Sequence, residues 1–515
     1  MALNKNKYKV LLLFSVFISI HSLAQKVVSI SINHEKAVPL MGYNSDMSNT
    51  PKWSDPKFSE ALNGLHPKTL RYPGGSNSLY WDWEKGWTLS YEELLPILNE
   101  KKFEYQGKAI TTVNEFRQLA SSNRKSNSFW RQVYRYNAKV PKYNTLEEFA
   151  KGLNSTQSEA VITLNVITSH LEKELELLRS AKNKGIKLKY IELGNEVYAE
   201  NLLTKHIYPT VDNYIDTCIS WTKAIWKEFP DAHIGVVGGD KNRRTRNWNE
   251  KLSSALINSF SKAQQKQLHF ILHYYSHFKH PEYDLNSNTG YEKLVAFPKL
   301  DLEFKLRNWR WSNTSPFSTW VTEYNMIEQQ PYPINNTWAH GLLVASQINE
   351  LLTKTKSEMF HFHSIGAEKF PVFAALQLMD KNENYLTPTT SGIVTSLWNR
   401  LTENADRFYS ADVNISPWTL YYEAKSKDNP NNLKEEKTIT FTPVNAYISY
   451  EKQKAKLLIV NFSAEELSVD LSSFIGKCEA TQHHAKPTDT KSKIIKHTIE
   501  GKASLPPYSI SLFEE

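Results

Sequence analysis

The sequence predicts an α/β fold, a (β/α)8 TIM barrel followed by a C-terminal antiparallel β-sandwich domain. Two observations carry this prediction. Apolar strand-like runs alternate with amphipathic helices from about residue 160 to about residue 400, and short alternating strands with polar spacers follow. The length of 515 residues suits one large domain and one small one.

The barrel is expected over residues 41–402. Its clearest strand candidates are 160–167, 188–193, 234–237, 268–275, 319–323 and 358–363. After the first of these, Leu171, Leu175 and Leu178 recur on one face of a helix, and Gly185 ends that helix. The alternation also fits a doubly wound parallel sheet. Because no strand is followed by a glycine-rich dinucleotide-binding turn, the barrel is favoured.

The sandwich is expected over residues 403–515. Its strands are predicted at 420–423, 438–441, 457–462, 467–471 and 508–513. Residues 27–32 alternate in the same way, so the segment 25–40 is expected to supply a strand that pairs with this domain.

An insertion at about 84–143, rich in Lys, Glu, Asn and Arg, interrupts the barrel pattern. Insertions between barrel strands usually decorate the loop face, where they shape the active site. A solvated pair of helices with no role in the cleft is an equally good interpretation of this composition.

Residues 1–24 have the pattern of a secretory signal peptide. Three lysines precede the apolar run Val10–Ile20, and Ser22 and Ala24 place small residues at the positions that a signal peptidase reads. The run is too short to span a bilayer. We therefore expect a secreted or periplasmic protein without a membrane segment after cleavage.

Charge and cysteine usage narrow the function classes. The chain has 62 Lys and Arg against 54 Asp and Glu, scattered along its length, so nucleic-acid binding is not indicated. Cys218 and Cys478 are far apart and are expected in different domains, which argues against a disulfide framework. His361 and His363 alternate on a late strand without a third ligand at metal spacing. We expect no metal and no cofactor, and the sequence does not indicate an oligomeric state.

Two glutamates stand at strand ends, where a barrel carries its active site. The strand at 190–193 runs through Gly194 into Glu196, and the strand at 319–323 ends on Glu323. Retaining cleavage of a glycosidic bond needs one carboxyl group to protonate the leaving oxygen and a second, roughly 5 Å away, to attack the anomeric carbon. Glu196 and Glu323, on strands four and seven, could meet across the barrel mouth. The pattern therefore predicts a retaining glycoside hydrolase.

Four motifs occur in order along the chain: Arg71-Tyr-Pro-Gly-Gly75, Glu192-Leu-Gly-Asn-Glu196, His273-Tyr-Tyr275 and Thr322-Glu-Tyr-Asn325. Together they resemble the strand-end motifs of clan A retaining glycoside hydrolases. The likeness is greatest to the α-L-arabinofuranosidases of family 51 and the glucuronidase/heparanase group of family 79, and it covers most of residues 40–400. Family 51 usually has Asn directly after Pro-Gly-Gly, whereas Ser76 stands there in this chain and Asn77 follows.

The resemblance implies roles for the matching residues. Glu196 would be the general acid/base, which must hold a proton near neutral pH, and Glu323 would be the nucleophile. Arg71 would lie beneath Glu323 and keep it ionised. Asn195 would hydrogen-bond the sugar 2-hydroxyl. Tyr275 would donate a hydrogen bond to Glu323.

Three further residues are expected to contact the substrate. His273 would line the same subsite as Tyr275, and Asn77 stands next to the usual position of the turn asparagine. Trp81 is the first of three tryptophans after the Pro-Gly-Gly turn. It is expected to stack on a sugar ring, although core packing is at least as common for any single tryptophan.

The expected substrate is a plant or algal polysaccharide or oligosaccharide. Two alternatives remain open. One is another clan A specificity, such as a β-glucuronidase or an endo-galactanase. The other is a non-catalytic carbohydrate-binding barrel, which the presence of both glutamates and their supporting residues disfavours.

Overall fold

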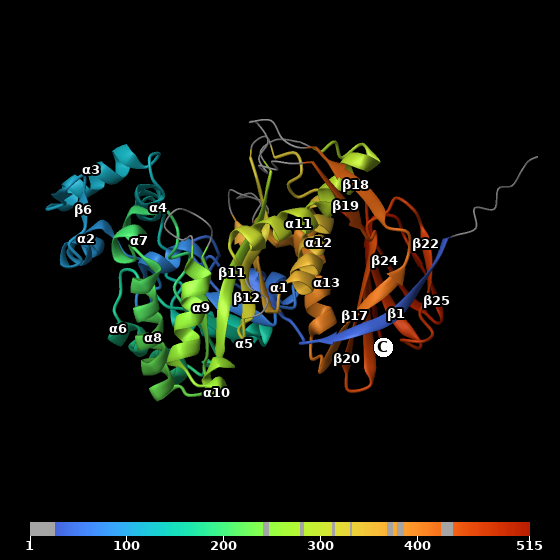
Figure 1. Cartoon of the computed structure of the whole chain (residues 1–515), viewed down its shortest axis with the longest axis horizontal. Helices are drawn as coiled ribbons and strands as arrows, with labels where there is room; N and C mark the ends of the chain where they lie inside the picture. The colour runs from blue at the N-terminus through green and yellow to red at the C-terminus, as the bar shows by residue number, and fades with distance from the viewer. Residues whose placement is uncertain are drawn as a thin grey trace, which may run out of the picture.

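The computed structural model describes residues 26–239, 247–278, 283–311, 315–329, 332–367, 374–378, 386–423 and 436–515. The expected signal peptide, 1–24, lies outside the described residues. Figure 1 shows a central barrel, with the helices of the insertion at one end of the molecule and a β-domain at the other.

Eight parallel strands close the barrel. In chain order they are β2 (Leu40–Asn44), β3 (Thr69–Tyr72), β8 (Glu159–Thr163), β9 (Tyr190–Leu193), β10 (His233–Val237), β11 (Leu268–Phe278), β12 (Ser318–Glu328) and β13 (Ser357–His363). Closure comes where β13 pairs in parallel with β2. The predicted (β/α)8 fold is therefore confirmed.

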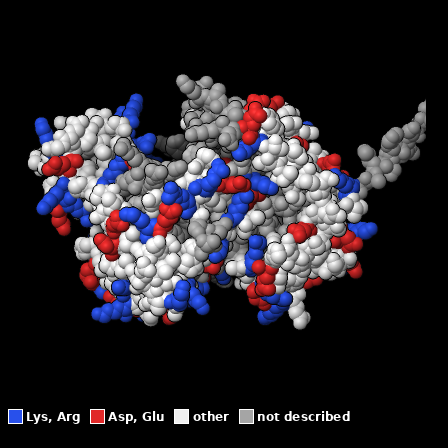
Figure 2. Space-filling view, viewed as in Figure 1, with Lys and Arg blue, Asp and Glu red and all other residues white. Residues whose placement is uncertain are grey.

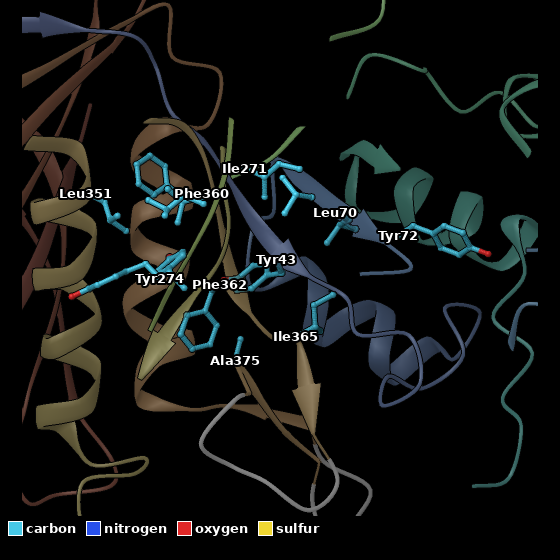
Figure 3. Packing of buried hydrophobic residues seen from close by; sticks show 14 of the residues in the cluster. Tyr43, Leu70, Tyr72, Ile271, Tyr274, Leu351, Phe360, Phe362, Ile365 and Ala375 are labelled. Carbon is cyan, nitrogen blue, oxygen red and sulfur yellow. The ribbon is translucent and has the colours of Figure 1, made fainter. Parts of the chain in front are cut away.

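Side chains fill the barrel and the layer around it. Val161, Tyr190, Trp320 and Met359 come from strands on opposite sides of the barrel and form one buried cluster, so the interior is a packed core. Outside the strands, a much larger cluster joins them to the helices. Figure 3 shows part of it, with Phe360 of β13 and Leu351 of the covering helix α12 (Trp338–Lys354).

The outer helices begin and end at recognisable caps. The helix α6 (Leu171–Asn183) precedes Gly185, whose φ of +78° suits a residue without a side chain. The other long outer helices are α8 (Val211–Glu228), α9 (Trp248–Ser259), α11 (Asn288–Asn308) and α13 (Thr390–Thr402). In α12, Thr337 caps the N-terminus by accepting from the backbone N–H of His340.

The segment predicted as an insertion lies in the connection from β3 to α5 (Leu146–Thr156). It contains α2 (Tyr91–Glu100), α3 (Val113–Asn123) and α4 (Ser128–Ala138). Aromatic rings hold these helices together, for example Phe116 against Phe129 and Trp130. This packing orders the segment, so it is more than a solvated pair of helices.

The β-domain is built on one nine-stranded sheet with its own core. Its strands are, in spatial order, β24 (Lys493–Ile499), β23 (Cys478–His484), β26 (Ser509–Glu514), β21 (Lys454–Asn461), β20 (Val444–Glu451), β17 (Arg407–Asn414), β1 (Lys26–Lys36), β22 (Leu467–Asp470) and β25 (Lys502–Leu505). All neighbours are antiparallel except β1 and β22, which are parallel. The predicted C-terminal antiparallel domain is thus confirmed.

Two of the predicted sandwich strands do not join this sheet. They form a separate two-stranded sheet, β18 (Trp418–Tyr422) with β19 (Lys437–Phe441). Their buried side chains belong to the barrel-side core, and Tyr422 Oη donates to the carbonyl of Lys293 on α11 at 2.7 Å. The alternating pattern marked the strands correctly, but their apolar face packs on a barrel helix.

Both cysteines are buried free thiols, Cys218 in α8 and Cys478 in β23. Within the described ranges, no helix combines the length and the hydropathy that a membrane span requires. Figure 2 shows acidic and basic side chains interspersed on one face of the molecule.

Candidate active site

The carboxyl groups of Glu196 and Glu323 lie close together. Glu196 follows the end of β9, whereas Glu323 lies within β12, which continues to Glu328 and does not end on Glu323 as expected. Each offers an oxygen within 4.8 Å of an oxygen of the other. Retaining glycosidases hold their two carboxyl groups about 5–5.5 Å apart, so this spacing suits a double displacement. Glu196 has a side chain 30% exposed, whereas that of Glu323 is 6% exposed.

A sharp turn after β9 aims Glu196 into the site. Gly194 has a φ of +93°, and Glu196 itself has a φ of +41°, which is uncommon for a residue with a side chain. A Cβ on Gly194 would come within 2.6 Å of Val166 Cγ2. The turn therefore requires glycine, and the backbone strain at Glu196 is of the kind that functional sites retain.

Glu323 is surrounded by groups that stabilise its charge. Arg71 Nη1 donates to Oε1 at 2.8 Å, and Tyr275 Oη donates to Oε2 at 2.6 Å. The ring Nδ1 atoms of His273 and His363 lie 3.7 and 3.9 Å from Oε2. Burial by itself would raise the pKa of Glu323, but these neighbours outweigh it and lower the pKa to about 2. The carboxyl group is therefore ionised at neutral pH, as a nucleophile must be.

Arg71, on β3, is fully buried, and its guanidinium donates three hydrogen bonds. Nε donates to Glu192 Oε2 at 2.7 Å, Nη1 to Glu323 Oε1 at 2.8 Å and Nη2 to Asn195 Oδ1 at 2.9 Å. The amide oxygen of Asn195 is thereby engaged. Its amide nitrogen has no hydrogen-bond partner among the described residues. This nitrogen is the group that could donate to a substrate hydroxyl.

His273 connects the two carboxyl groups. Its Nδ1 lies 3.0 Å from Glu196 Oε1, and its Nε2 lies 3.3 Å from Thr322 Oγ1. Burial would lower the pKa of His273, but the nearby charges of Glu323 and Glu196 raise it overall. A proton on Nδ1 can therefore be shared with Glu196.

Asn77 lies beside the site, but its polar atoms are used within the protein. Its Nδ2 donates to the carbonyl of Gly74 at 2.9 Å, and its Oδ1 accepts from Tyr136 Oη at 3.4 Å. Tyr136 belongs to α4, so the insertion reaches the site through this contact. Asn77 is 1% exposed and holds the turn in place, whereas a direct contact with substrate had been expected.

Trp81 does not lie in the cleft. It is 4% exposed, donates from Nε1 to Tyr72 Oη at 2.9 Å and packs against Trp87. Neither face of its indole is open to a sugar ring. The expected stacking role for Trp81 is therefore corrected to core packing beneath the insertion.

Three site residues were not predicted. Glu192 pairs with Arg71, His363 faces Glu323, and Asn44 at the end of β2 lies with its Nδ2 2.6 Å from His363 Nδ1. Each stands within or at the end of a barrel strand, and that position was the available signal. His363 had been considered only as a possible metal ligand.

Glu196, His273 and Glu323 are also a set of potential ligand side chains, with atoms within 4.8 Å of one another. However, the Arg71 guanidinium already occupies Glu323 Oε1, and its fixed charge would repel a cation. The donor set therefore suits proton transfer between carboxyl groups better than it suits a metal ion.

The sequence matches no protein-family model and no curated protein. Its fold, in contrast, matches solved structures over most of the chain. The family 51 α-L-arabinofuranosidase of Bifidobacterium longum is similar with a TM-score of 0.61 and 13% identity, covering 95% of this chain and 100% of that one.

Two further structures extend the likeness. The GH51 α-L-arabinofuranosidase of Thermotoga petrophila RKU-1 has a TM-score of 0.59 and 14% identity, with 95% of this chain and 99% of that chain covered. A 4-O-α-L-rhamnosyl-β-D-glucuronidase of Fusarium oxysporum 12S has a TM-score of 0.53 and 12% identity, with 95% and 100% covered. The chain therefore has the fold of the family 51 α-L-arabinofuranosidases, as its strand-end motifs predicted.

Proposed function

We propose that the protein is a retaining glycoside hydrolase in which Glu323 is the nucleophile and Glu196 the general acid/base. The observation that carries the proposal is the pair of carboxyl groups within 4.8 Å, of which one is held ionised by Arg71 and Tyr275. The fold shared with named glycosidases supports the same conclusion.

The proposed reaction is a double displacement. Glu323 attacks the anomeric carbon while Glu196 gives its proton to the leaving oxygen, so the glycosidic bond breaks and a glycosyl ester forms. Glu196, now a carboxylate, takes a proton from water, and that water attacks the anomeric carbon and releases Glu323. Asn195 donates to the sugar hydroxyl beside the reacting carbon, and His273 shares its proton with Glu196 between the two steps.

The substrate class that we propose is a plant or algal polysaccharide or an oligosaccharide derived from it. Solved structures with this fold include α-L-arabinofuranosidases and a rhamnosyl-glucuronidase, all named for the removal of sugar units. We also propose that the protein acts outside the cytoplasm, because residues 1–24 have the pattern of a secretory signal.

The test is a release assay on aryl glycosides and on plant and algal polysaccharides. Wild type is compared with Glu196→Gln, Glu323→Gln and a control, Glu350→Gln, which changes a buried glutamate on α12 away from the site. We expect both site variants to lose activity on natural substrates and the control to keep it. Proton NMR of the first product should show the anomeric configuration of the substrate.

Two outcomes would contradict the proposal. Hydrolysis that survives Glu323→Gln would mean that the nucleophile is another group. Glycan binding by a wild type that hydrolyses none of the panel would support the carbohydrate-binding barrel instead.

A further inference from the structure

One buried cation lies between two buried carboxylates at the floor of the site. Arg71 Nε is 2.7 Å from Glu192 Oε2, and Arg71 Nη1 is 2.8 Å from Glu323 Oε1. The side chains of Arg71 and Glu192 are 0% exposed and that of Glu323 is 6% exposed. A single carboxylate would suffice to neutralise the guanidinium, so the second one requires an explanation.

Double displacement supplies that explanation. When Glu323 attacks the sugar it becomes an ester, and its negative charge is lost until water releases it. If Glu323 were the sole counter-ion, the fully buried Arg71 would become an unpaired cation in every turnover. Its remaining contact, Asn195 Oδ1 at 2.9 Å, offers a dipole but no charge. An unpaired buried charge is strongly unfavourable.

We propose that Glu192 is the permanent counter-ion of Arg71, a positioning residue that keeps the guanidinium paired and in place while Glu323 alternates between carboxylate and glycosyl ester. This inference rests on the proposed function, because it assigns a purpose to Glu192 within that reaction. Glu192 cannot touch the substrate itself, since its side chain is fully buried.

The surroundings of Glu192 fit this role. Its Oε2 accepts from Thr163 Oγ1 at 2.8 Å as well as from Arg71, and its Oε1 is buried without a hydrogen-bond partner among the described residues. The ion pairs of Glu192 within the described residues all go to Arg71. The two charges therefore depend on each other, and Thr163 fixes the carboxylate on the side that faces Arg71.

A cycle of stability measurements tests the pairing without any substrate. Glu192→Gln leaves Arg71 paired with Glu323, and Glu323→Gln leaves it paired with Glu192. The double variant leaves it with neither. We expect the double variant to lose clearly more in melting temperature than the two single variants lose together. The control pair, Glu350→Gln with Glu323→Gln, should be additive because Glu350 lies on α12.

Additive losses in the test cycle would overturn the inference. If the double variant does not fold, adding Arg71→Met removes the stranded cation, and the triple variant should fold again. A triple variant that also stays unfolded would overturn the inference in the same way. Both readouts are independent of activity, so they remain informative if no glycoside is hydrolysed.

Kinetics test the role in turnover. In Glu192→Gln, Glu323 is the one carboxylate of the described residues left to pair with Arg71, so the positive charge of Arg71 stabilises it more strongly. The other neighbours of Glu323 stay the same: His273, His363, Tyr275 and Glu196. A better stabilised carboxylate is a poorer nucleophile and a better leaving group. Rapid mixing with a dinitrophenyl glycoside should show glycosylation slowed by about tenfold, which corresponds to about 1.4 kcal/mol in the activation free energy. Release of the sugar should not be slowed, because Glu323 is the leaving group in that step, so the burst shrinks. An equal loss in both steps would point to a structural role only.

Discussion

Tyr275→Phe removes one hydroxyl group and tests how Glu323 is held ionised. The hydroxyl donates to Glu323 Oε2 at 2.6 Å, and Arg71 still binds Oε1 at 2.8 Å in the variant. A hydrogen bond to a charged group contributes about 1.5–3 kcal/mol. One pKa unit corresponds to about 1.4 kcal/mol, so the pKa of Glu323 should rise from about 2 to about 3–4.

The assay is the pH dependence of kcat/KM between pH 3 and pH 7. The wild type should keep its nucleophile ionised throughout this range, so ionisation of Glu323 produces no acid limb there. In the Phe variant the carboxylate is protonated as pH falls through about 3–4, and an acid limb should enter the range. Circular dichroism at each pH separates this limb from unfolding.

The neighbouring Tyr274 is the matched control. Its hydroxyl lies 3.1 Å from Asp301 Oδ2 and 3.2 Å from Ser276 Oγ, outside the site. Tyr274→Phe should leave the acid limb where the wild type has it. If Tyr275→Phe shows no acid limb above pH 3, or if both variants show the same one, the assignment of Tyr275 as a donor to the nucleophile is wrong.

Three further predictions concern the surroundings of the site. Gly74 has a φ of +68°, and a Cβ at this position would come within 1.8 Å of Asn44 Oδ1. Gly74→Ala should therefore lower both the melting temperature and kcat, and an unchanged kcat would contradict the tight packing of this turn. Trp81→Ala should lower the free energy of unfolding by about 3–5 kcal/mol in denaturant titrations, with little change in KM. A raised KM without a loss of stability would indicate that Trp81 contacts the substrate. Burial raises the pKa of Glu174 to about 7, so the stability that its protonated form provides below about pH 4.5 is lost as pH rises through 7. Glu174→Gln stays neutral and should be more stable than wild type at pH 8 by up to ~3 kcal/mol in urea titrations, with no advantage below pH 5.

The strand ends were the predictable part of the site. Glu196 follows the apolar run of β9 and Glu323 closes the apolar run that begins β12, and a barrel brings the carboxyl ends of its strands to one face. The sequence places these side chains at the mouth, and the structure adds the distances between them. The contacts of Tyr275 and Arg71 with Glu323 were expected only from the resemblance to the clan A hydrolases.

The remaining site residues depend on information that is not local. Glu192 lies within a fully buried strand, where both faces are covered and the two-residue period no longer separates inside from outside. Trp81 sits in an excursion that builds its own aromatic core, and spacing alone cannot distinguish such a tryptophan from one in a cleft. The strands at β18 and β19 alternate like any half-buried strand, whichever partner covers them.

The position of β1 in the β-domain affects how the chain folds. This strand, drawn in blue among the red strands of Figure 1, pairs Ser29 with Asn414 and Lys26 with Leu467, so it joins β17 to β22. In topological terms the whole barrel is an insert within the β-domain. During synthesis β1 stays unpaired until β17, more than 370 residues further along the chain, has been made. At about 5–20 residues per second, this wait lasts roughly 20–75 s. The barrel can close first, and the β-domain then assembles around a strand that was made before any of its neighbours.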